Sequence, residues 1–558
     1  MKQWVIREKV SENLEEHLLF YRGIKTKEEA EKFLNPDYEM DLHDPFEILD
    51  MDKAADRILQ AVKNNERIII FGDYDADGVC AAAIFYDFFK KIDFENFHIH
   101  IPDRHLDGYG LTSEAIDEFI EQKAGLIITV DCGITDYDEV EKINKAGIDA
   151  VIIDHHLVPE KLPNAFAIID SKQEKDNYPF KYLCGAGTAF KTIQALIIKG
   201  NFNIVPGWEK WLLDLVAIAT IADMVPLVGE NRILACYGLK VLEKTNRIGL
   251  LNLFRRLDMS QKNITEDDIS FMIAPRINIA SRMDHANTSF ELLTTSSSEE
   301  ANWITSRLES LNNDRRGIVD AIIDEVDKRI SQEELPNIIV EGDLGWNTGV
   351  LGLTAHRLID NYKRPVFLWG KGKAKQIKGS CRSDGSVNMV ELMGILPEGI
   401  LIEMGGHAMA GGFSLAEEKI GEFKKEILKA YEKMPKEKTE NGILHIDKEL
   451  NIDEINWKFY GVVEKFRPFG IDNPKPVFLF SDAEIVNVRK FGNNGLHLQL
   501  DFERSKGEKI SAIGFFMAQQ ENFNFIAGQR VDLVASLEKS TYRTLPELRL
   551  KIIDVKVK

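Results

Sequence analysis

The sequence is poor in cysteine, in uncharged hydrophobic runs and in net positive charge, and each shortage excludes a class of protein. The chain has five scattered cysteines and no Cys-x-x-Cys pair: Cys80, Cys132, Cys184, Cys236 and Cys381. This usage argues against a disulfide framework and a zinc ribbon, and it indicates a reducing cytosol. We therefore expect a cytoplasmic protein.

Long hydrophobic runs are also scarce. The first ten residues are charged and lack the apolar core of a signal peptide, so export is not expected. The most apolar long window, residues 211–228, contains Asp214 and Asp223. A charge near the centre of a bilayer costs at least about 2.5 kcal/mol, so we expect a buried helix here and no membrane partner.

The balance of charge is strongly acidic, with a formal net charge of -20 over 558 residues. Such a chain does not bind nucleic acid through its overall charge, so any contact with phosphates must come from a local basic groove. The composition is otherwise typical of globular proteins, with 44% hydrophobic and 29% charged residues. A chain of this length is expected to divide into about three or four domains.

The order of patterns along the chain predicts a multidomain α/β protein. Strand-like and helix-like segments alternate over residues 66–170, and the apolar strands indicate a parallel sheet covered on both faces. Later segments read as helices, a long charged connector, a second α/β unit and short β-type runs. We predict an N-terminal segment (1–48), a parallel-sheet domain (49–295), a connector helix (296–335), a smaller α/β domain (336–436) and a C-terminal β-barrel (437–558).

Three carboxylates, Asp73, Asp75 and Asp77, follow an apolar strand on one tight turn before a helix. Open α/β sheets bind ligands at the carboxyl ends of their strands. Like charges this close repel one another unless cations neutralise them. Taken alone, the run is equally well explained as an Asp-Gly turn whose acids cap the following helix.

Carboxylates recur at the ends of later strands, which favours a metal site. Asp131 ends one predicted strand, and Asp154, His155 and His156 end the next, so all should meet at one edge of the sheet. Asp223 stands in an otherwise apolar predicted helix, where an unpaired carboxylate needs a cation or a strong donor. Oxygen ligands with one or two histidines suit Mn²⁺ or Mg²⁺, and two such ions could hydrolyse a phosphoester.

These residues carry a resemblance to the DHH phosphoesterase superfamily. Its four ordered motifs are similar to Asp73-Tyr-Asp-Ala-Asp-Gly, Asp131-Cys-Gly, Asp154-His-His and Ala222-Asp-Met-Val-Pro. Further segments resemble the RecJ single-strand-specific exonucleases, and the likeness covers nearly all of the chain after about Glu28: Ile101-Pro-Asp-Arg-His-Leu-Asp-Gly-Tyr-Gly, Pro275-Arg-Ile-Asn, Gly379-Ser-Cys-Arg-Ser, Gly405-Gly-His-Ala-Met-Ala-Gly-Gly and Pro468-Phe-Gly-Ile-Asp-Asn-Pro.

The resemblance implies roles for the acidic and histidine residues. The implied metal ligands are Asp75, Asp77, Asp131, His155 and Asp223, with Asp73 as a further candidate and Asp131 as the bridge between two Mn²⁺ or Mg²⁺ ions. His156 corresponds to a histidine near the scissile phosphate, and Asp154 would orient its neighbours. The implied catalytic set is Asp131, Asp154, His155 and His156, with a metal-held water as nucleophile and no covalent enzyme intermediate.

A basic island interrupts the acidic chain between residues 363 and 382. It contains no acid before Asp384, and its cations are either a solvated face or a phosphate contact: Lys363, Arg364, Lys371, Lys373, Lys375, Lys378 and Arg382. The family resemblance implies that Ser380 and Arg382, with Arg104 and Arg276, bind a 5′ phosphate. It also places Asn278 and His407 at the substrate.

The C-terminal barrel resembles an oligonucleotide-binding (OB) fold, which pairs a basic groove with aromatic platforms. Its candidate groove residues are Lys490, Phe491, Phe515, Phe516 and Tyr542, although a core position is the safer interpretation of Phe515 and Phe516. Three sites depart from the family pattern and could adjust end recognition or rate, but none removes a predicted metal ligand: Asn347-Thr348, Cys381 and Ser281.

The resemblance predicts a single-strand-specific 5′→3′ exodeoxyribonuclease that releases 5′-mononucleotides in DNA repair and recombination. The expected partners are single-stranded DNA with a 5′ end, a helicase and a single-strand-binding protein, and the expected state is a monomer. One alternative is a DHH phosphodiesterase for short oligonucleotides or cyclic dinucleotides. Another is an inactive DHH scaffold that binds DNA or replication proteins.

Overall fold

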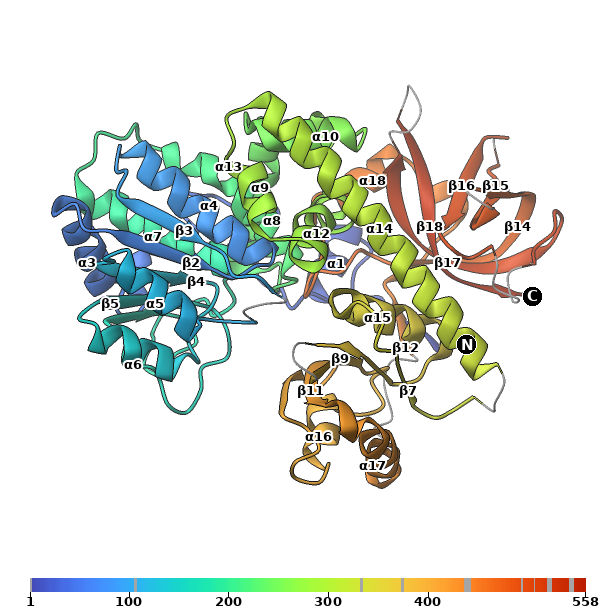
Figure 1. Ribbon diagram of the computed structural model, residues 1–558. Helices are drawn as coiled ribbons and strands as arrows, with labels where there is room; N and C mark the ends of the chain where they lie inside the picture. Colours follow the sequence, from blue (N-terminus) through green and yellow to red (C-terminus); the bar gives the residue numbers. More distant parts are fainter. Residues whose placement is uncertain are drawn as a thin grey trace. The chain divides into compact units, whose positions relative to one another are not determined.

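The chain folds into two compact units in the computed structural model (Figure 1). The structure describes residues 3–104, 108–331, 335–372, 376–435, 443–492, 495–505, 507–518, 524–540 and 546–558. One unit, called the sheet unit, comprises Pro45–Asp223 and Val241–Asn441. The other, called the barrel unit, comprises Met1–Asp44, Met224–Lys240 and Gly442–Lys558. The second unit is therefore assembled from three separate stretches of the sequence.

The sheet unit is built around a five-stranded parallel sheet, as the apolar runs predicted. Its strands lie in the order β3 (Phe97–His100), β2 (Ile68–Gly72), β4 (Leu126–Val130), β5 (Asp149–Ile153) and β6 (Ala167–Ile169). Every neighbouring pair is parallel, so the carboxyl ends of all five strands meet at one edge. This edge is where the predicted carboxylates and histidines gather.

Helices cover both faces of this sheet, which explains why the strands are apolar throughout. On one face, α5 (Ser113–Glu121) and α6 (Tyr137–Lys145) form a core with alternate strand residues such as Phe71 and Ile127. On the other lie α3 (Met51–Lys63), α4 (Ala76–Lys91) and α7 (Gly185–Gly200) (Figure 1). Each strand is thus desolvated on both sides.

An all-helical region follows the sheet. Its helices are α8 (Leu213–Ala222), α10 (Ile248–Arg256), α12 (Ala274–Met283) and α13 (Asn287–Thr294), and then the long α14 (Ser298–Ile330). The last confirms the predicted connector as one uninterrupted helix, capped by the side chain of Ser297. One expectation was wrong: Asp223 does not lie inside its helix but is the C-terminal cap of α8. The helix ends there, and the Asp223 side chain is 27% exposed.

The sheet unit ends in a second, smaller α/β fold. Its five strands lie in the order β10 (Glu403–His407), β11 (Ala410–Ala416), β9 (Gln376–Arg382), β8 (Val366–Lys371) and β7 (Ile339–Gly342). Only the β7–β8 pair is parallel. The helices of this fold are α15 (Leu351–Tyr362), α16 (Met389–Gly394) and α17 (Ile420–Lys433). Its core contains Phe367, Phe413 and Phe423.

The barrel unit confirms the predicted C-terminal barrel. The strands follow the order β13 (Lys448–Glu449), β14 (Phe478–Phe491), β15 (His497–Glu503), β16 (Lys509–Gly514), β18 (Glu547–Val557) and β17 (Arg530–Ser540). A further β14–β17 pairing closes the sheet on itself. Closure removes the exposed strand edges that an open sheet of this size would present.

The N-terminal segment belongs to this barrel unit. Its strand β1 (Gln3–Ile6) pairs in parallel with β12 (Ile443–Ile446), and two short helices follow, α1 (Leu14–Phe20) and α2 (Lys27–Leu34). Helix α9 (Gly229–Leu242) contributes Arg232, which donates hydrogen bonds to backbone carbonyls beside α18 (Trp457–Glu464). No helix in the described ranges is both long and apolar enough to cross a membrane.

Candidate metal centre and nucleic-acid contacts

The acidic turn after β2 combines the two roles that the sequence left open, a helix cap and a group of candidate metal ligands. Asp75 is the N-cap of α4, and its side chain accepts hydrogen bonds from the backbone N–H groups of Asp77 and Gly78. The chain therefore does not stay extended through the turn, yet the three carboxylates still face one edge of the sheet. Asn278 from α12 closes the turn, because its side-chain oxygen accepts from Ala76 N–H at 2.8 Å.

Asp77 is held by the beginning of another helix. Its two carboxylate oxygens accept the backbone N–H groups of Gly185 and Ala186 at 2.7 Å each. These are the first residues of α7, where the free N–H groups and the helix dipole favour a negative charge. Each carboxylate oxygen keeps a lone pair for a second partner. The two hydrogen bonds therefore orient Asp77 and leave it able to bind a cation.

Asp131 stands at the end of β4 in a backbone conformation that favours glycine, with a φ of 63°. A non-glycine residue at positive φ is strained, and such strain concentrates at functional sites. Its Oδ1 atom is buried and accepts no hydrogen bond from any described residue. A buried carboxylate oxygen of this kind calls for a cation.

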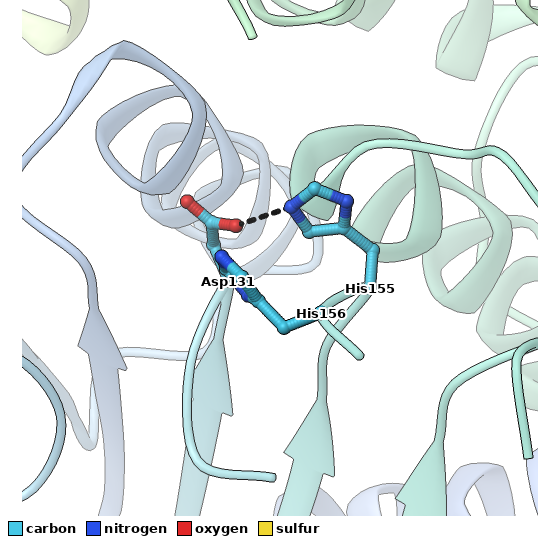
Figure 2. A group of neighbouring side chains, drawn as sticks. All are labelled: Asp131, His155 and His156. Carbon is cyan, nitrogen blue, oxygen red and sulfur yellow. Dashed lines mark ion pairs between the residues drawn. The ribbon is translucent and has the colours of Figure 1, made fainter. Parts of the chain in front are cut away.

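The ring of His155 lies at the centre of the carboxylates. Its Nε2 atom is 3.1 Å from Asp131 Oδ1, 3.6 Å from Asp77 Oδ2 and 3.7 Å from Asp223 Oδ2. Figure 2 shows the side chains of Asp131 and His155 pointing toward each other from neighbouring strand ends. The sheet and α8 thus bring together residues that lie as far apart in sequence as 77 and 223.

The carboxylates are difficult to ionise together without a cation. Burial and the charge of Asp75 raise the pKa of Asp77 to about 6, and burial and the charge of Asp77 raise that of Asp223 to about 7. Burial and neighbouring acids also raise the pKa values of Asp73 and Asp131 well above the ordinary range. Divalent cations would remove this repulsion, so the donor set suits a metal centre.

The two histidines differ in charge. Burial lowers the pKa of His155 to about 4, so its imidazole is neutral at pH 7, which is the form that ligates metals. Burial also opposes the charge on His156, but its hydrogen bond to Asp154 raises its pKa to about 9. Asp154 Oδ1 lies 2.7 Å from His156 Nδ1 and accepts the backbone N–H of His155 as well. Asp154 therefore fixes both histidines.

Three groups of side chains could each hold an ion, and two of them share Asp131. Within each group, the ligand atoms lie within 4.8 Å of one another. The groups are Asp77, His155 and Asp223; Asp131, His155 and His156; and Asp73, Asp75 and Asp131. A carboxylate shared between adjacent groups is the arrangement that two-metal phosphoesterases require. The donor set therefore suits divalent cations, and Asp131 is the carboxylate that two of the groups have in common.

Basic residues border the acidic edge. Arg104, from the loop after β3, lies with its guanidinium carbon 5.0 Å from the ring centre of Tyr74. Arg282 of α12 lies near both Arg104 and the carboxylate of Asp75. Burial and repulsion from Arg104 lower its pKa to about 10, while the charge of Asp75 raises it. The positive charge here is thus held close to the carboxylates.

Arg276 is paired with a carboxylate. It is only 4% exposed, and its Nε and Nη2 atoms donate to the Glu309 carboxylate on α14 at 3.1 and 3.3 Å. Its Nη1 atom donates to the carbonyl of Met272. The side chain therefore joins α12 to α14, and its predicted contact with a phosphate stays a prediction.

Ser380 and Arg382 lie on β9, beside the first turn of α15. A β-carbon added to Gly352 in that turn would come within 2.8 Å of Arg382 Nη2 and 3.7 Å of Ser380 Oγ. The glycine allows the two side chains to approach a helix N-terminus, which is itself a favourable place for an anion. His407 is exposed on β10. Lys373 and Lys375 of the basic island lie outside the described residues.

Sequence reasoning missed several residues of the site. Tyr109 places its hydroxyl 3.2 Å from His156 Nδ1, and its ring meets the His156 ring edge-on. Gly185 lies against Asp131, where a β-carbon would come within 2.5 Å. The Gly108-Tyr-Gly110 and Gly185-Ala-Gly187 runs are the signals that could have drawn attention to them, as could the cation Arg282.

The barrel corrects one expectation, since Phe515 and Phe516 are not core residues. They are 41% and 68% exposed, and Phe516 has a φ of 57°. Both rings contact the ring of His497, which also contacts Phe491. The four rings form an aromatic cluster on the barrel surface, bordered by Arg549. Tyr542 lies outside the described residues.

Three family models match successive parts of the chain. The DHH family N-terminal domain matches residues 67–220, the DHHA1 domain residues 335–433 and the RecJ OB domain residues 446–554. The single-stranded-DNA-specific exonuclease RecJ of Bacillus subtilis is 35% identical over 538 residues, which cover 96% of this chain and 67% of the relative. The RecJ of Haemophilus influenzae is 30% identical over 523 residues, or 91% of each chain.

Solved structures agree with this result. The crystal structure of RecJ from Thermus thermophilus in complex with Mn²⁺ superposes with a TM-score of 0.80 at 26% identity. The match covers 97% of this chain and 76% of that one. The Mg²⁺ complex of the same protein superposes with a TM-score of 0.74 at 24% identity, which supports the shared fold. The chain belongs to the RecJ family of the DHH superfamily.

Proposed function

We propose that the protein is a metal-dependent exonuclease that degrades single-stranded DNA from its 5′ end and releases 5′-mononucleotides. The observation that carries this proposal is the cluster of carboxylates around Asp131, beside the neutral imidazole of His155. The relatives named as single-stranded-DNA-specific exonucleases share nearly the whole length of this chain. We place the reaction in the cytoplasm, in DNA repair and recombination.

We assign the metal ligands to two adjacent positions. Asp77, His155 and Asp223 would hold one ion, and Asp73 and Asp75 the other. Asp131 would serve both, because it groups with Asp73 and Asp75 and its Oδ1 lies 3.1 Å from His155 Nε2. Mn²⁺ or Mg²⁺ bound in this way would supply an activated water and neutralise charge on the phosphate. The α7 N-terminus orients Asp77, and the α4 cap orients Asp75, so the ligand positions are set by helix ends.

His156 supports the reaction from beside the ions. The Asp154 carboxylate holds its Nδ1 at 2.7 Å and keeps the ring protonated, with the pKa raised to about 9. The imidazolium can then donate from Nε2 to a phosphate oxygen whose charge grows in the transition state. We therefore assign His156 to phosphate stabilisation and Asp154 to holding both histidines in place.

The 5′ end would bind where α15 begins. Ser380 Oγ and the Arg382 guanidinium converge beside Gly352, and Arg104 lies close enough to repel Arg382. A terminal phosphate carries a charge of about −1.5 to −2 at pH 7, which two guanidinium groups would neutralise. We propose that this positive charge favours binding of a strand that ends in a 5′ phosphate.

The barrel would hold the rest of the strand. Bases stack on exposed aromatic rings without regard to sequence, and Phe491, His497, Phe515 and Phe516 offer such rings. A single strand presents its bases, whereas a duplex buries them. We further propose that the protein is a monomer and works beside a helicase and a single-strand-binding protein, which light scattering and binding assays with these proteins would test.

One assay tests the proposal and separates its alternatives. The protein is incubated with Mn²⁺ and with end-labelled long single strands, duplexes and dinucleotides. We expect mononucleotides to be released from the 5′ end of the single strands alone. Cleavage of dinucleotides only would refute the exonuclease and favour an oligonucleotide phosphodiesterase. Tight binding of single strands without any cleavage would favour a scaffold.

A further inference from the structure

Tyr74 occupies an unusual place in the acidic turn. Its neighbours in sequence are Asp73 and Asp75, two candidate metal ligands, but the phenol ring itself faces a cation. The guanidinium carbon of Arg104 lies 5.0 Å from the centre of this ring. A guanidinium within about 6 Å of an aromatic face is attracted to it, more strongly where water is excluded.

Arg104 has neighbours of both charges, because Asp73 attracts it while two other arginines repel it. Arg282 and Arg382 are both near it, and repulsion by Arg104 contributes to the lowered pKa of each. Repulsion by the two arginines weakens the hold on Arg104, so a further attraction would help to fix its position. The ring of Tyr74 provides an attractive surface that adds no charge, because a tyrosine phenol is neutral at pH 7.

We propose that Tyr74 is a positioning residue, which holds Arg104 over the acidic turn so that the guanidinium of Arg104 binds the 5′ phosphate of the substrate. This inference rests on the proposed function. Recognition of the 5′ end and binding of the metal ions would then depend on the same short segment, since the residue that holds Arg104 lies between Asp73 and Asp75. The contact uses the face of the ring, so the phenolic hydroxyl is not required.

Two substitutions separate the ring from the hydroxyl. Tyr74→Leu removes the aromatic face at similar bulk, and Tyr74→Phe keeps it. Rates are measured on single strands that carry either a 5′ phosphate or a 5′ hydroxyl. For Tyr74→Leu we expect kcat/KM to fall about five- to thirtyfold on the phosphorylated strand, and less than about twofold on the hydroxyl strand. Tyr74→Phe should keep the wild-type rate on both.

Arg104→Gln supplies the cross-check. If Tyr74 acts through Arg104, the double variant should be no slower on the phosphorylated strand than Arg104→Gln alone. Mn²⁺ affinity and the unfolding temperature of Tyr74→Leu should stay at wild-type values, which shows that the turn is intact. Equal losses of Tyr74→Leu on both strands, or additive losses in the double variant, would overturn the inference.

The same experiment distinguishes this inference from the proposed function. A wild-type protein that degrades single strands but is indifferent to the 5′ phosphate would overturn the proposed end recognition and the role of Tyr74 together. A phosphate-dependent wild type with an unaffected Tyr74→Leu variant would overturn the role of Tyr74 alone.

Discussion

Gly185→Ala should disable the metal centre although Gly185 offers no ligand. Gly185 is the first residue of α7, and its backbone N–H donates to Asp77 Oδ2 at 2.7 Å. A β-carbon at this position would come within 2.5 Å of Asp131 Cβ and 2.6 Å of Asp131 Oδ1. The methyl group of alanine therefore cannot be accommodated without moving either the helix or the bridging carboxylate.

The size of the effect follows from this overlap. Carbon atoms pack at about 3.5–4.0 Å, so the 2.5 Å approach must open by about 1 Å. A misplacement of this size in a catalytic group costs about a hundredfold in rate. Overpacking of a buried site costs about 1–3 kcal/mol of unfolding free energy, so the variant should still fold. We expect kcat/KM to fall about a hundredfold, with weaker Mn²⁺ binding.

The assay compares Gly185→Ala with Gly187→Ala, a matched change in the same helical turn. A β-carbon on Gly187 would meet Leu183 at 3.5 Å and Cys184 Sγ at 3.6 Å, which are ordinary contacts. Release of mononucleotides and Mn²⁺ affinity are measured for both variants. Wild-type rate and affinity in Gly185→Ala would refute the reasoning, as would an equal loss in Gly187→Ala.

Four further predictions address the metal centre, its pH dependence and the substrate contacts. Asp131→Ala should abolish cleavage and leave binding to single strands in gel-shift assays substantially intact; an active variant would refute the bridging role. Asp77 and Asp223 have raised pKa values in the folded protein, about 6 and about 7. Their protonated forms therefore stabilise the metal-free fold fully below about pH 4, and this stabilisation is lost as the pH rises through those values. Mn²⁺ should accordingly raise the unfolding temperature more at pH 8 than at pH 5.5, and chelation should stop cleavage; a gain that does not vary with pH would contradict this. Phe516→Ala should weaken single-strand binding by about 1–3 kcal/mol with little effect on stability, and unchanged affinity in fluorescence titrations would argue against stacking. Arg276→Gln should lower the free energy of unfolding by about 1–3 kcal/mol, because it leaves the acceptor on α14 unpaired; loss of 5′-phosphate preference at full stability would point to substrate binding instead.

Much of the sheet and of its acidic edge could be predicted from the sequence. The continuous apolar runs imply buried parallel strands, because only such strands are covered on both faces. Once the strands are parallel, their carboxyl ends share one edge, which brings Asp75, Asp131 and His155 together without any structural information. The long charged stretch before residue 331 is one helix, since its periodicity and its Ser297 cap are local properties.

Tertiary structure decided what depends on partners that are distant in sequence. Local pattern does not reveal that α7 would present two N–H groups to Asp77, or that Asp223 would end its helix 3.7 Å from His155. Burial is likewise a property of the whole fold, so Phe516 was expected in the core but lies exposed, and the hydrogen bonds from Arg276 to Glu309 of α14 could not be foreseen.

The same division holds for the protein as a whole. The sequence by itself determined which chemical groups are available and which edge of the sheet they reach, because strand period and helix caps act over a few residues. Only the folded chain decided which carboxylates lie close together, which helix end orients Asp77 and which arginine lies over Tyr74. These contacts depend on side chains that are brought within a few ångströms by packing, a long-range effect that no short segment encodes.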